Sequence, residues 1–163
     1  MSDIFHESVP DDIILHIFAT MNACPQHIFQ VLTKRPERLA QLNDRINWTP
    51  NIWMGVTIEN NKYLYRADLL RKCNAKLRFI SAEPLIGEIN DINLEQIDWL
   101  IVGGESGSQA RPMDASWVRA LRDKAQTEKV AFFFKQWGGT VKKKTGRVLD
   151  GQTYDEYPQK SNN

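Results

Sequence analysis

The amino-acid sequence predicts an α/β protein with a parallel sheet, built as a partial, TIM-like (β/α) barrel. Five short and almost continuously apolar runs alternate with segments whose apolar residues recur at helical spacing. Such runs are typical of parallel strands that are buried on both faces. The chain has 163 residues, of which 42% are hydrophobic and 25% charged, as is ordinary for a folded domain. A flat, doubly wound sheet is the alternative architecture for the same alternation.

The apolar runs give about five expected strands, in chain order. They cover residues 28–32, 52–58, 77–80, 98–102 and 130–134. The segments between them are expected to be helical, because parallel neighbours need a crossover connection. One helix is expected before the first strand, others from Pro36, at 61–73 and after Asp114, and a short helix or turn at 91–97.

Local signals indicate where the first and last helices begin. Pro10 followed by Asp11 and Asp12 suits a first turn, because proline loses only an unpaired donor there and carboxylates favour the helix N-terminus. Asp114 is the expected N-cap of the last helix. The apolar stripe of the first helix is expected to contain Ile13, Ile17 and Met21, beside Ile14 and Phe18.

The composition changes near the C-terminus, which predicts two parts. Residues 1–139 are expected to form the partial barrel domain, and residues 140–163 a C-terminal tail. The three lysines at 142–144 predict a solvated charge run, and Asp150-Gly151 between apolar pairs predicts a hairpin. Beyond Pro158 we expect the chain to fray.

Charge and cysteine content exclude several classes of protein. Lys and Arg total 21 and Asp and Glu total 20, a net charge of +1, which argues against binding nucleic acid or membranes by bulk electrostatics. No apolar run approaches the roughly 18 residues of a membrane span, and no signal peptide is visible. Cys24 and Cys73 form neither a metal-ligand spacing nor a disulfide framework, so a cytoplasmic setting is expected.

Polar residues gather where each predicted strand ends. In parallel α/β folds ligands bind at the carboxyl ends of the strands, so we expect a small-molecule or nucleotide-like ligand there. The candidate ligand-binding residues are Lys34, Arg35, Glu59, Glu83, Gly103, Gly104, Glu105, Arg111, Lys135 and Gln136. Ordinary loop composition is the alternative explanation for the pattern.

Several candidates suggest a specific chemistry. Lys34 and Arg35 suit a phosphate or carboxylate. Gly103-Gly104 would let the backbone approach a ligand or hold an anion, or would form a tight turn with positive φ. Lys135 is expected to pair with a carboxylate such as Glu105 rather than to act as a nucleophile.

Glu59 and Glu83 could serve as acid and base, but salt bridges to the neighbouring cations are the more expected role. A metal site is not expected. Asp3, His6 and Glu7 are capable of binding a metal, but the other histidines lie on different predicted elements.

Blocks of sequence along nearly the whole chain also carry a family resemblance. They are MSDIFHE at 1–7, FQVLTKRPER at 29–38, WMGVTIEN at 53–60, FISAEPL at 79–85, IVGGESG at 101–107, FFFKQWG at 132–138 and GRVLDG at 146–151. In this order they resemble a phage- and prophage-associated, radical-SAM-like family of unknown function (phage protein Gp37/Gp68 type). The resemblance implies a partial parallel barrel whose intact members hold an iron–sulfur cluster on a loop ending in CxxCYA and use S-adenosylmethionine.

Neither Cys24 nor Cys73 occupies that motif, so the chain resembles an N-terminally truncated member with no cofactor of its own. The resemblance implies either an enzyme remnant that is not competent for radical chemistry or a non-catalytic phage accessory protein that binds a ligand at the polar mouth. Whether the chain is an enzyme stays open at this point. Absence of the first family strand predicts an exposed sheet edge at the strand that begins at Ile28, or at its spatial neighbour, and self-association through it. The alternative is that residues 1–8, with the apolar Ile4 and Phe5, fold back and cover the gap.

Overall fold

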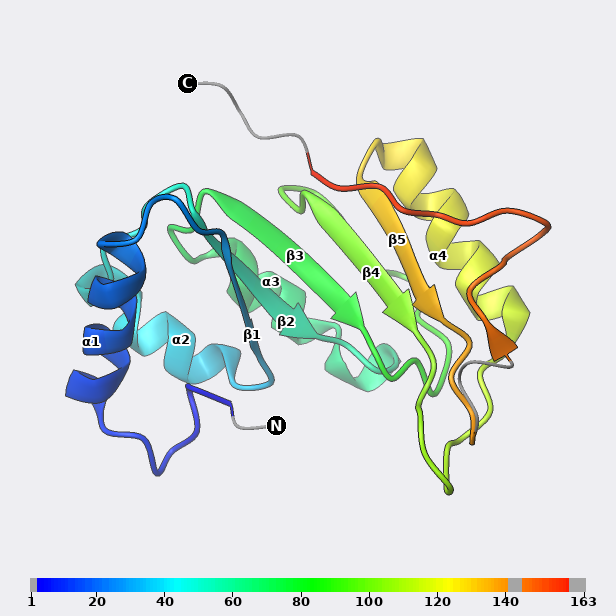
Figure 1. The fold of residues 1–163 in the computed structure, drawn as a ribbon, viewed down its shortest axis with the longest axis horizontal. Helices are drawn as coiled ribbons and strands as arrows, with labels where there is room; N and C mark the ends of the chain where they lie inside the picture. Colours follow the sequence, from blue (N-terminus) through cyan, green and yellow to red (C-terminus); the bar gives the residue numbers. More distant parts are fainter. Residues whose placement is uncertain (1–2, 141–144, 159–163) are drawn as a thin grey trace.

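The computed structural model describes residues 3–140 and 145–158, and its helices and strands alternate as predicted (Figure 1). The strands are β1 (Phe29–Thr33), β2 (Ile52–Thr57), β3 (Leu77–Ala82), β4 (Trp99–Gly103) and β5 (Ala131–Gln136). The α-helices are α1 (Asp11–Asn22), α2 (Pro36–Leu42), α3 (Tyr65–Arg71) and α4 (Ala115–Glu128). Residues 91–97 contain turns and no helix, and the predicted lysine run at 142–144 and frayed end after Pro158 lie outside the described residues.

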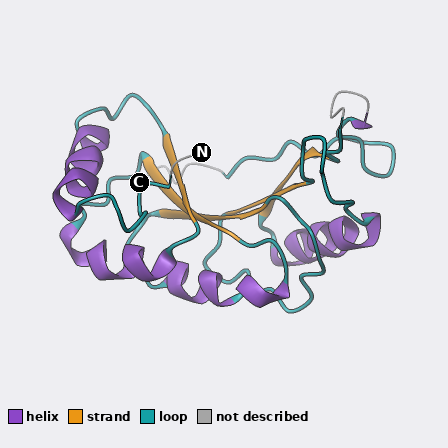
Figure 2. Cartoon of the chain, turned by 90° about the horizontal axis from the view of Figure 1, so that it is seen from below, coloured by secondary structure: helices purple, strands orange, loops and turns teal. Residues whose placement is uncertain are grey.

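The five strands form one sheet in the order β1-β2-β3-β4-β5, and all neighbours are parallel. Each crossover adds the next strand on the same side, so crossovers of one hand place the helices on one face. Figure 2 shows the helices along one side of a curved sheet, whose other, concave side carries none. The parallel α/β prediction is therefore confirmed. The doubly wound alternative does not apply because it needs helices on both faces, and the sheet does not close into a barrel.

Burial explains why the strands read as apolar runs. All six residues of β2 are buried, and so are five of the six in β3. β1 differs because it lies at the edge of the sheet, and its Gln30 and Leu32 are exposed. Continuous apolarity thus marks the central strands, whereas the edge strand alternates.

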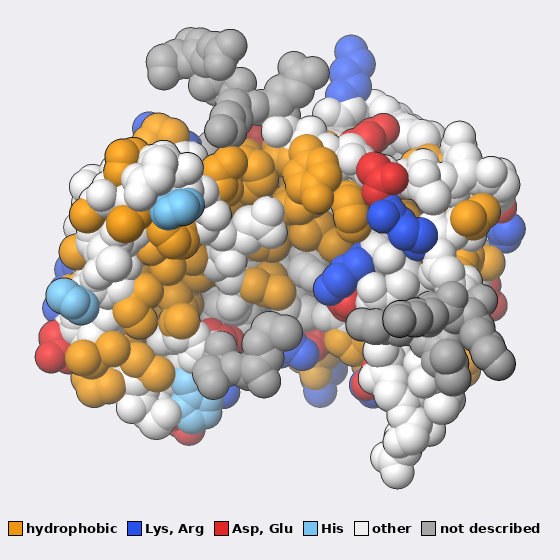
Figure 3. Space-filling model, viewed as in Figure 1, with side chains coloured by type: hydrophobic (Ala, Val, Ile, Leu, Met, Phe, Trp, Pro, Cys, Tyr) orange, Lys and Arg blue, Asp and Glu red, His pale blue; other side chains and the backbone are white. Residues whose placement is uncertain are grey.

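Figure 3 shows hydrophobic side chains across the middle of the concave face, which has no helices over it. Trp53, Phe79 and Trp99 are almost fully buried there, and Phe133 packs against them. Gly55 makes room for this layer, because a Cβ at that position would come within 2.4 Å of the Phe79 ring. The chain therefore has two apolar layers, one under the helices and one on the concave face.

The buried side of α1 differs from the predicted stripe. Ile14 and Phe18 are fully buried, whereas Ile13 is 47% exposed. Ile17 and Met21 are only half-buried. The prediction centred on Ile13 is wrong by one position, because the face of α1 that meets the core is set by the pair at i and i+4, Ile14 and Phe18.

The segment before α1 covers one end of β1 only. Phe5 is fully buried against the ring of Phe18, and Asp3 accepts a hydrogen bond from the Thr33 hydroxyl at the carboxyl end of β1. Ile28 and Leu32 stay 40% and 37% exposed. Among the described residues β2 is the only strand paired with β1, so its outer edge is open.

The C-terminal strap, residues 145–158, closes the opposite edge of the sheet. The backbone N–H of Phe134 donates to the carbonyl of Tyr154 at 3.0 Å, and that of Glu156 donates to Phe132 at 3.2 Å. The strap therefore runs antiparallel to β5. The sheet is thereby protected at β5 and unprotected at β1.

Ion pairs fix the turn of the C-terminal strap to α4. Leu149 and Gln152 pair across Asp150, whose carboxylate accepts from Arg119 at 2.8 Å and from Arg122 at 2.6 Å. Hydrogen bonds from Arg119 and then Arg122 lower the pKa of Asp150 to about 2. The turn is therefore held by a carboxylate that stays ionised at neutral pH.

We predict that the Asp150→Asn variant is less stable than the wild type and that the difference depends on pH. Because the folded-state pKa lies below its usual value of about 3.9, the stabilisation is present above about pH 4 and is lost as pH falls towards about 2. Thermal unfolding of both proteins across this range measures it. Asp91→Asn, at an exposed residue, is the charge-matched control. A difference that persists unchanged at the acid limit contradicts the prediction.

The open edge of β1 predicts self-association, because unpaired strand edges recruit other strands. Light scattering at increasing protein concentration should show a rising mean mass. A lysine at the edge opposes such pairing, so Gln30→Lys is expected to reduce the mass at a given concentration. Gln126→Lys adds the same charge at an exposed position of α4 and should not. A wild-type chain that stays monomeric throughout rules the prediction out.

Candidate functional site

The carboxyl ends of the strands enclose a hollow of about 570 Å³. Its lining residues are Asp3, Leu32, Thr33, Lys34, Arg35, Thr57, Ser81, Glu83, Pro84 and Lys135. They come from the N-terminal segment, from β1, β2 and β3, from the loops that follow β1 and β3, and from β5. The all-parallel topology brings these ends to one edge, which is where the sequence analysis expected polar groups to meet.

The hollow brings together part of the predicted site. Lys34, Arg35, Glu83 and Lys135 line it. The remaining candidates lie outside the lining: Glu59, Gly103, Gly104, Glu105, Arg111 and Gln136. Two of these still act on it, because Glu59 holds Lys34 and Gln136 holds Glu83.

Asp3 ties the N-terminal segment to the rim of the hollow. Its carboxylate accepts from the Thr33 hydroxyl at 2.8 Å, from the Lys34 backbone N–H at 2.9 Å and from Arg35 at 3.3 Å. Burial alone would raise the pKa of Asp3, but hydrogen bonds from Lys34, Thr33 and Phe5, with the charge of Arg35, leave it below its usual value. Asp3 is therefore a structural anion, which the sequence analysis considered only as a metal ligand.

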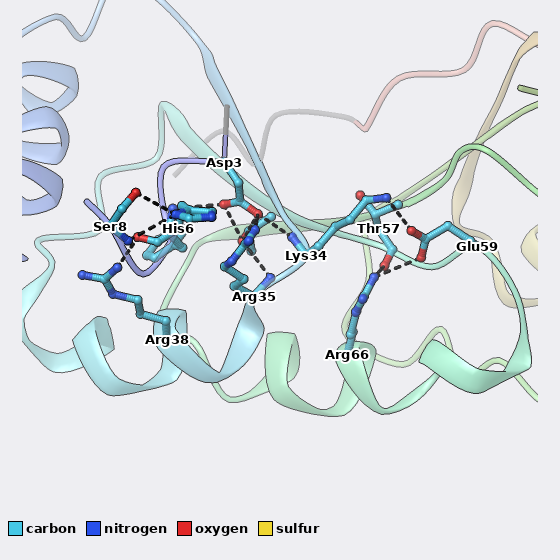
Figure 4. Close-up of polar contacts among 11 residues, drawn as sticks. Asp3, His6, Ser8, Lys34, Arg35, Arg38, Thr57, Glu59 and Arg66 are labelled. Atoms are coloured by element: carbon cyan, nitrogen blue, oxygen red, sulfur yellow. Dashed lines mark hydrogen bonds and ion pairs between the residues drawn. The ribbon is translucent and has the colours of Figure 1, made fainter. Parts of the chain in front are cut away.

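Glu59 is a buried carboxylate held between two cations (Figure 4). One oxygen accepts from the Lys34 ammonium at 2.5 Å and the other from Arg66 at 3.0 Å. Arg66 also donates to the Thr57 carbonyl at 2.7 Å and stacks 4.1 Å from the Tyr63 ring centre. The Arg66 side chain is 8% exposed and that of Lys34 is 50% exposed, so Arg66 is the buried partner of Glu59 and Lys34 the half-exposed one.

Glu83 has the same kind of double partnership on the other side of the hollow. It accepts from the Lys135 ammonium at 2.9 Å and from the Gln136 amide at 2.7 Å. The sequence analysis expected Lys135 to pair with a carboxylate such as Glu105. The structure gives it Glu83 instead, because Glu105 is bound by Arg111 through two side-chain contacts of 2.8 and 2.7 Å. Hydrogen bonds from Arg111 lower the pKa of Glu105 to about 2.

The glycine pair after β4 serves backbone packing. A Cβ on Gly104 would lie 2.0 Å from the Trp137 carbonyl oxygen, and the Gly104 N–H already donates to the Gln136 carbonyl at 2.9 Å. That N–H is therefore not free to hold an anion. Neither Gly103 nor Gly104 has a positive φ, whereas Gly107 does. Close approach of the β4 and β5 loops is the reason for the pair.

Two hydroxyls on the floor of the hollow were not selected by the sequence analysis. Thr57 and Ser81 are 3% and 4% exposed, are register partners on β2 and β3, and both line the hollow. Within the described part of the chain, neither side chain has a hydrogen-bond partner. Neither oxygen is among the fully buried side-chain atoms that lack a partner, so both hydroxyls are open to the hollow although their residues are largely buried. The signal available in the sequence was a single hydroxyl residue at or next to the carboxyl end of each of two largely apolar strands.

The possible metal ligands of the N-terminal segment have other partners. Asp3 is bound by Thr33, and the Nδ1 atom of His6 lies 2.7 Å from the Ser8 hydroxyl (Figure 4). Among residues 3–140 and 145–158 no group of three or more His, Cys, Asp or Glu side chains could hold a metal. The described helices also include none with the length and apolarity needed to cross a membrane.

The ion pairs of Glu59 and Glu83 should contribute different amounts to the free energy of unfolding. Glu59→Gln leaves the buried Arg66 without a counter-charge and is expected to cost about 3 kcal/mol of unfolding free energy. Glu83→Gln faces the half-exposed Lys135 and is expected to cost less than about 1 kcal/mol. Urea unfolding of both variants measures the difference. Equal losses would mean that the buried Arg66 does not need Glu59 as its counter-charge.

Comparison with known proteins adds the family but no closer relative. No curated protein and no solved structure matches the chain. Residues 1–158 match the model of a family described as protein of unknown function (DUF5131). This match covers the sheet, the hollow and the C-terminal strap. The chain therefore belongs to the DUF5131 family.

Proposed function

We propose that the chain is a cytoplasmic binding module that holds a small anionic molecule in the hollow at the strand ends. The observation that carries the proposal is the pair of hydroxyls on Thr57 and Ser81, two largely buried residues whose oxygens face the hollow and have no protein partner among the described residues. A hydroxyl can donate to an anion. A ligand oxygen in the hollow would satisfy both groups at once.

The ion pairs around the hollow support the same proposal. Glu59 and Glu83 each have one fixed donor, Arg66 and Gln136 respectively. Each also holds one lysine that is about half exposed, Lys34 at 50% and Lys135 at 51%. If the lysine turns towards a ligand, Glu59 keeps the cation Arg66 and Glu83 keeps a hydrogen bond from the neutral Gln136 amide.

Asp3 follows the same arrangement with Arg35. The carboxylate keeps the donors from Thr33, Lys34 and Phe5, and the Arg35 contact is its longest at 3.3 Å. The Arg35 side chain is 39% exposed. Three cations thus border the hollow, each in a pair that can open at low cost.

The test is titration of the full chain with acetate and with inorganic phosphate, followed by amide NMR shifts. Shifts are expected at Thr57, Ser81 and Lys135. Lys135→Gln should weaken binding about fivefold, since a charge-assisted hydrogen bond from an exposed cation contributes about 1 kcal/mol. Lys124→Gln is the matched control, because Lys124 is 42% exposed and also ion-paired, to Glu128.

Two further outcomes bear on the proposal. Ser81→Ala should weaken anion binding, whereas Ser108→Ala, at an exposed loop residue, should leave it unchanged. Equal affinities for the wild type, Lys135→Gln and Ser81→Ala would reject the hollow as the site.

A second proposal concerns the larger architecture. A strand order that never reverses, a curved sheet and helices on one face are features of a partial (β/α) barrel. These features agree with a partial barrel of any type. From the sequence resemblance alone, we propose that the chain corresponds to the C-terminal part of a barrel of the phage-associated, radical-SAM-like type. In that case the hollow described above is the mouth of the barrel.

The residues of this chain do not fit the iron–sulfur cluster of such enzymes. The sequence has two cysteines, and burial raises the pKa of the Cys73 thiol, which disfavours the thiolate that a cluster needs. We therefore propose the cluster and S-adenosylmethionine for intact relatives only. An in-frame CxxCYA segment in the DNA before Met1 would favour an enzyme fragment, and a stop codon there would favour the accessory binding protein.

A further inference from the structure

The anion site adjoins a second hollow on the concave face. This groove has a volume of about 430 Å³ and shares Leu32, Ser81, Glu83 and Lys135 with the first hollow. The two spaces therefore meet at the unpartnered Ser81 hydroxyl. One end of the combined site is polar, and the other follows the apolar surface of the sheet.

Aromatic rings form the walls of the groove. Trp99 lies at the centre, with the rings of Phe79 and Phe133 at 5.9 Å and that of Tyr157 at 5.0 Å. The interplanar angles of 53° and 81° to Phe79 and Phe133 are tilted or edge-on. Phe79 and Trp99 are each only 3% exposed, so a further flat ring would contact chiefly Phe133, which is half-buried, and Tyr157. Edge-on and tilted contacts between aromatic rings are favourable beyond the area they bury.

The groove is also open at its sides. Leu32 is 37% exposed on the β1 side and Tyr157 is 57% exposed on the C-terminal strap. These two residues belong to the edges of the groove, so a flat molecule that enters between them would cover apolar surface that now faces water.

The charge at the polar end indicates a monoanion. The cations around it are Lys34, Arg35, Arg66 and Lys135, and the carboxylates are Asp3, Glu59 and Glu83. The balance is one positive charge in excess. A single negative charge on the ligand would neutralise it, with its oxygens against Ser81 and Lys135.

From these features we infer that the ligand class of the site is a flat aromatic acid, with its ring in the groove and its carboxylate at Ser81 and Lys135. The inference rests on the proposed anion-binding function and adds the part of the ligand that is not charged. It names a chemical class from the surface of the groove and the charge at its end.

The probe is 2-naphthoate, titrated into the full chain by calorimetry and amide NMR. It is compared with acetate, with cyclohexanecarboxylate and with uncharged 2-naphthalenemethanol. We expect 2-naphthoate to bind at least about tenfold more tightly than acetate, because its rings bury apolar area that acetate lacks. It should also bind more tightly than the other two probes.

Variants separate the two ends of the site. Tyr157 lines the groove but not the first hollow, so Tyr157→Ser should weaken 2-naphthoate about fivefold and leave acetate unchanged. Ile13→Gln is the control, because Ile13 is an exposed isoleucine outside the groove. Lys135→Gln should weaken both acids.

Each contrary result has a distinct meaning. If acetate and phosphate bind with dependence on Lys135 but 2-naphthoate binds no more tightly, the aromatic inference is overturned and the proposed function stands. Equal binding of cyclohexanecarboxylate overturns the requirement for an aromatic ring, and equal binding of 2-naphthalenemethanol overturns the acid. If none of the probes binds, both the inference and the proposed function fail.

Discussion

The constraint on which this structure depends is that each strand is added to the same side of the sheet in the same direction. The order β1-β2-β3-β4-β5 without reversal means that every right-handed crossover returns over the same face. Two consequences follow together. The carboxyl ends of all five strands lie at the same end of the sheet, where loops can supply polar groups. One face of the sheet has no helix to bury it.

The concave face therefore needs other side chains to cover its apolar surface, and several residues serve this purpose. Large rings on β3, β4 and β5 cover one another across the curve of the sheet, and Gly55 on β2 leaves space for the Phe79 ring. The C-terminal strap adds Tyr157 and pairs with the outer edge of β5. No comparable element protects β1 among the described residues, so the apolar layer ends at an exposed Leu32.

The sequence was most informative where a single physical cause determined the local structure. Strands buried on both faces appear as apolar runs, so all five were predicted to within two residues, and Asp114 caps α4 through its bond to the Ser116 N–H. The prediction failed where the answer depended on contacts from elsewhere. The buried side of α1 is displaced from Ile13 to Ile14, and Lys135 contacts Glu83 rather than Glu105 because Arg111 already binds Glu105.

The same distinction explains which site residues the sequence could identify. Charged residues at strand ends are visible in the sequence, but their freedom to respond to a ligand is not. That freedom depends on whether each carboxylate has a second, fixed donor, and those donors come from distant positions: Arg66 on α3 for Glu59 and Gln136 at the end of β5 for Glu83. An ion pair whose carboxylate has no second donor resists opening, because the carboxylate would be left as an unpaired charge. At the rim of this hollow Glu59 has a second cation and Glu83 a neutral amide donor, and the lysine paired with each carboxylate is about half exposed.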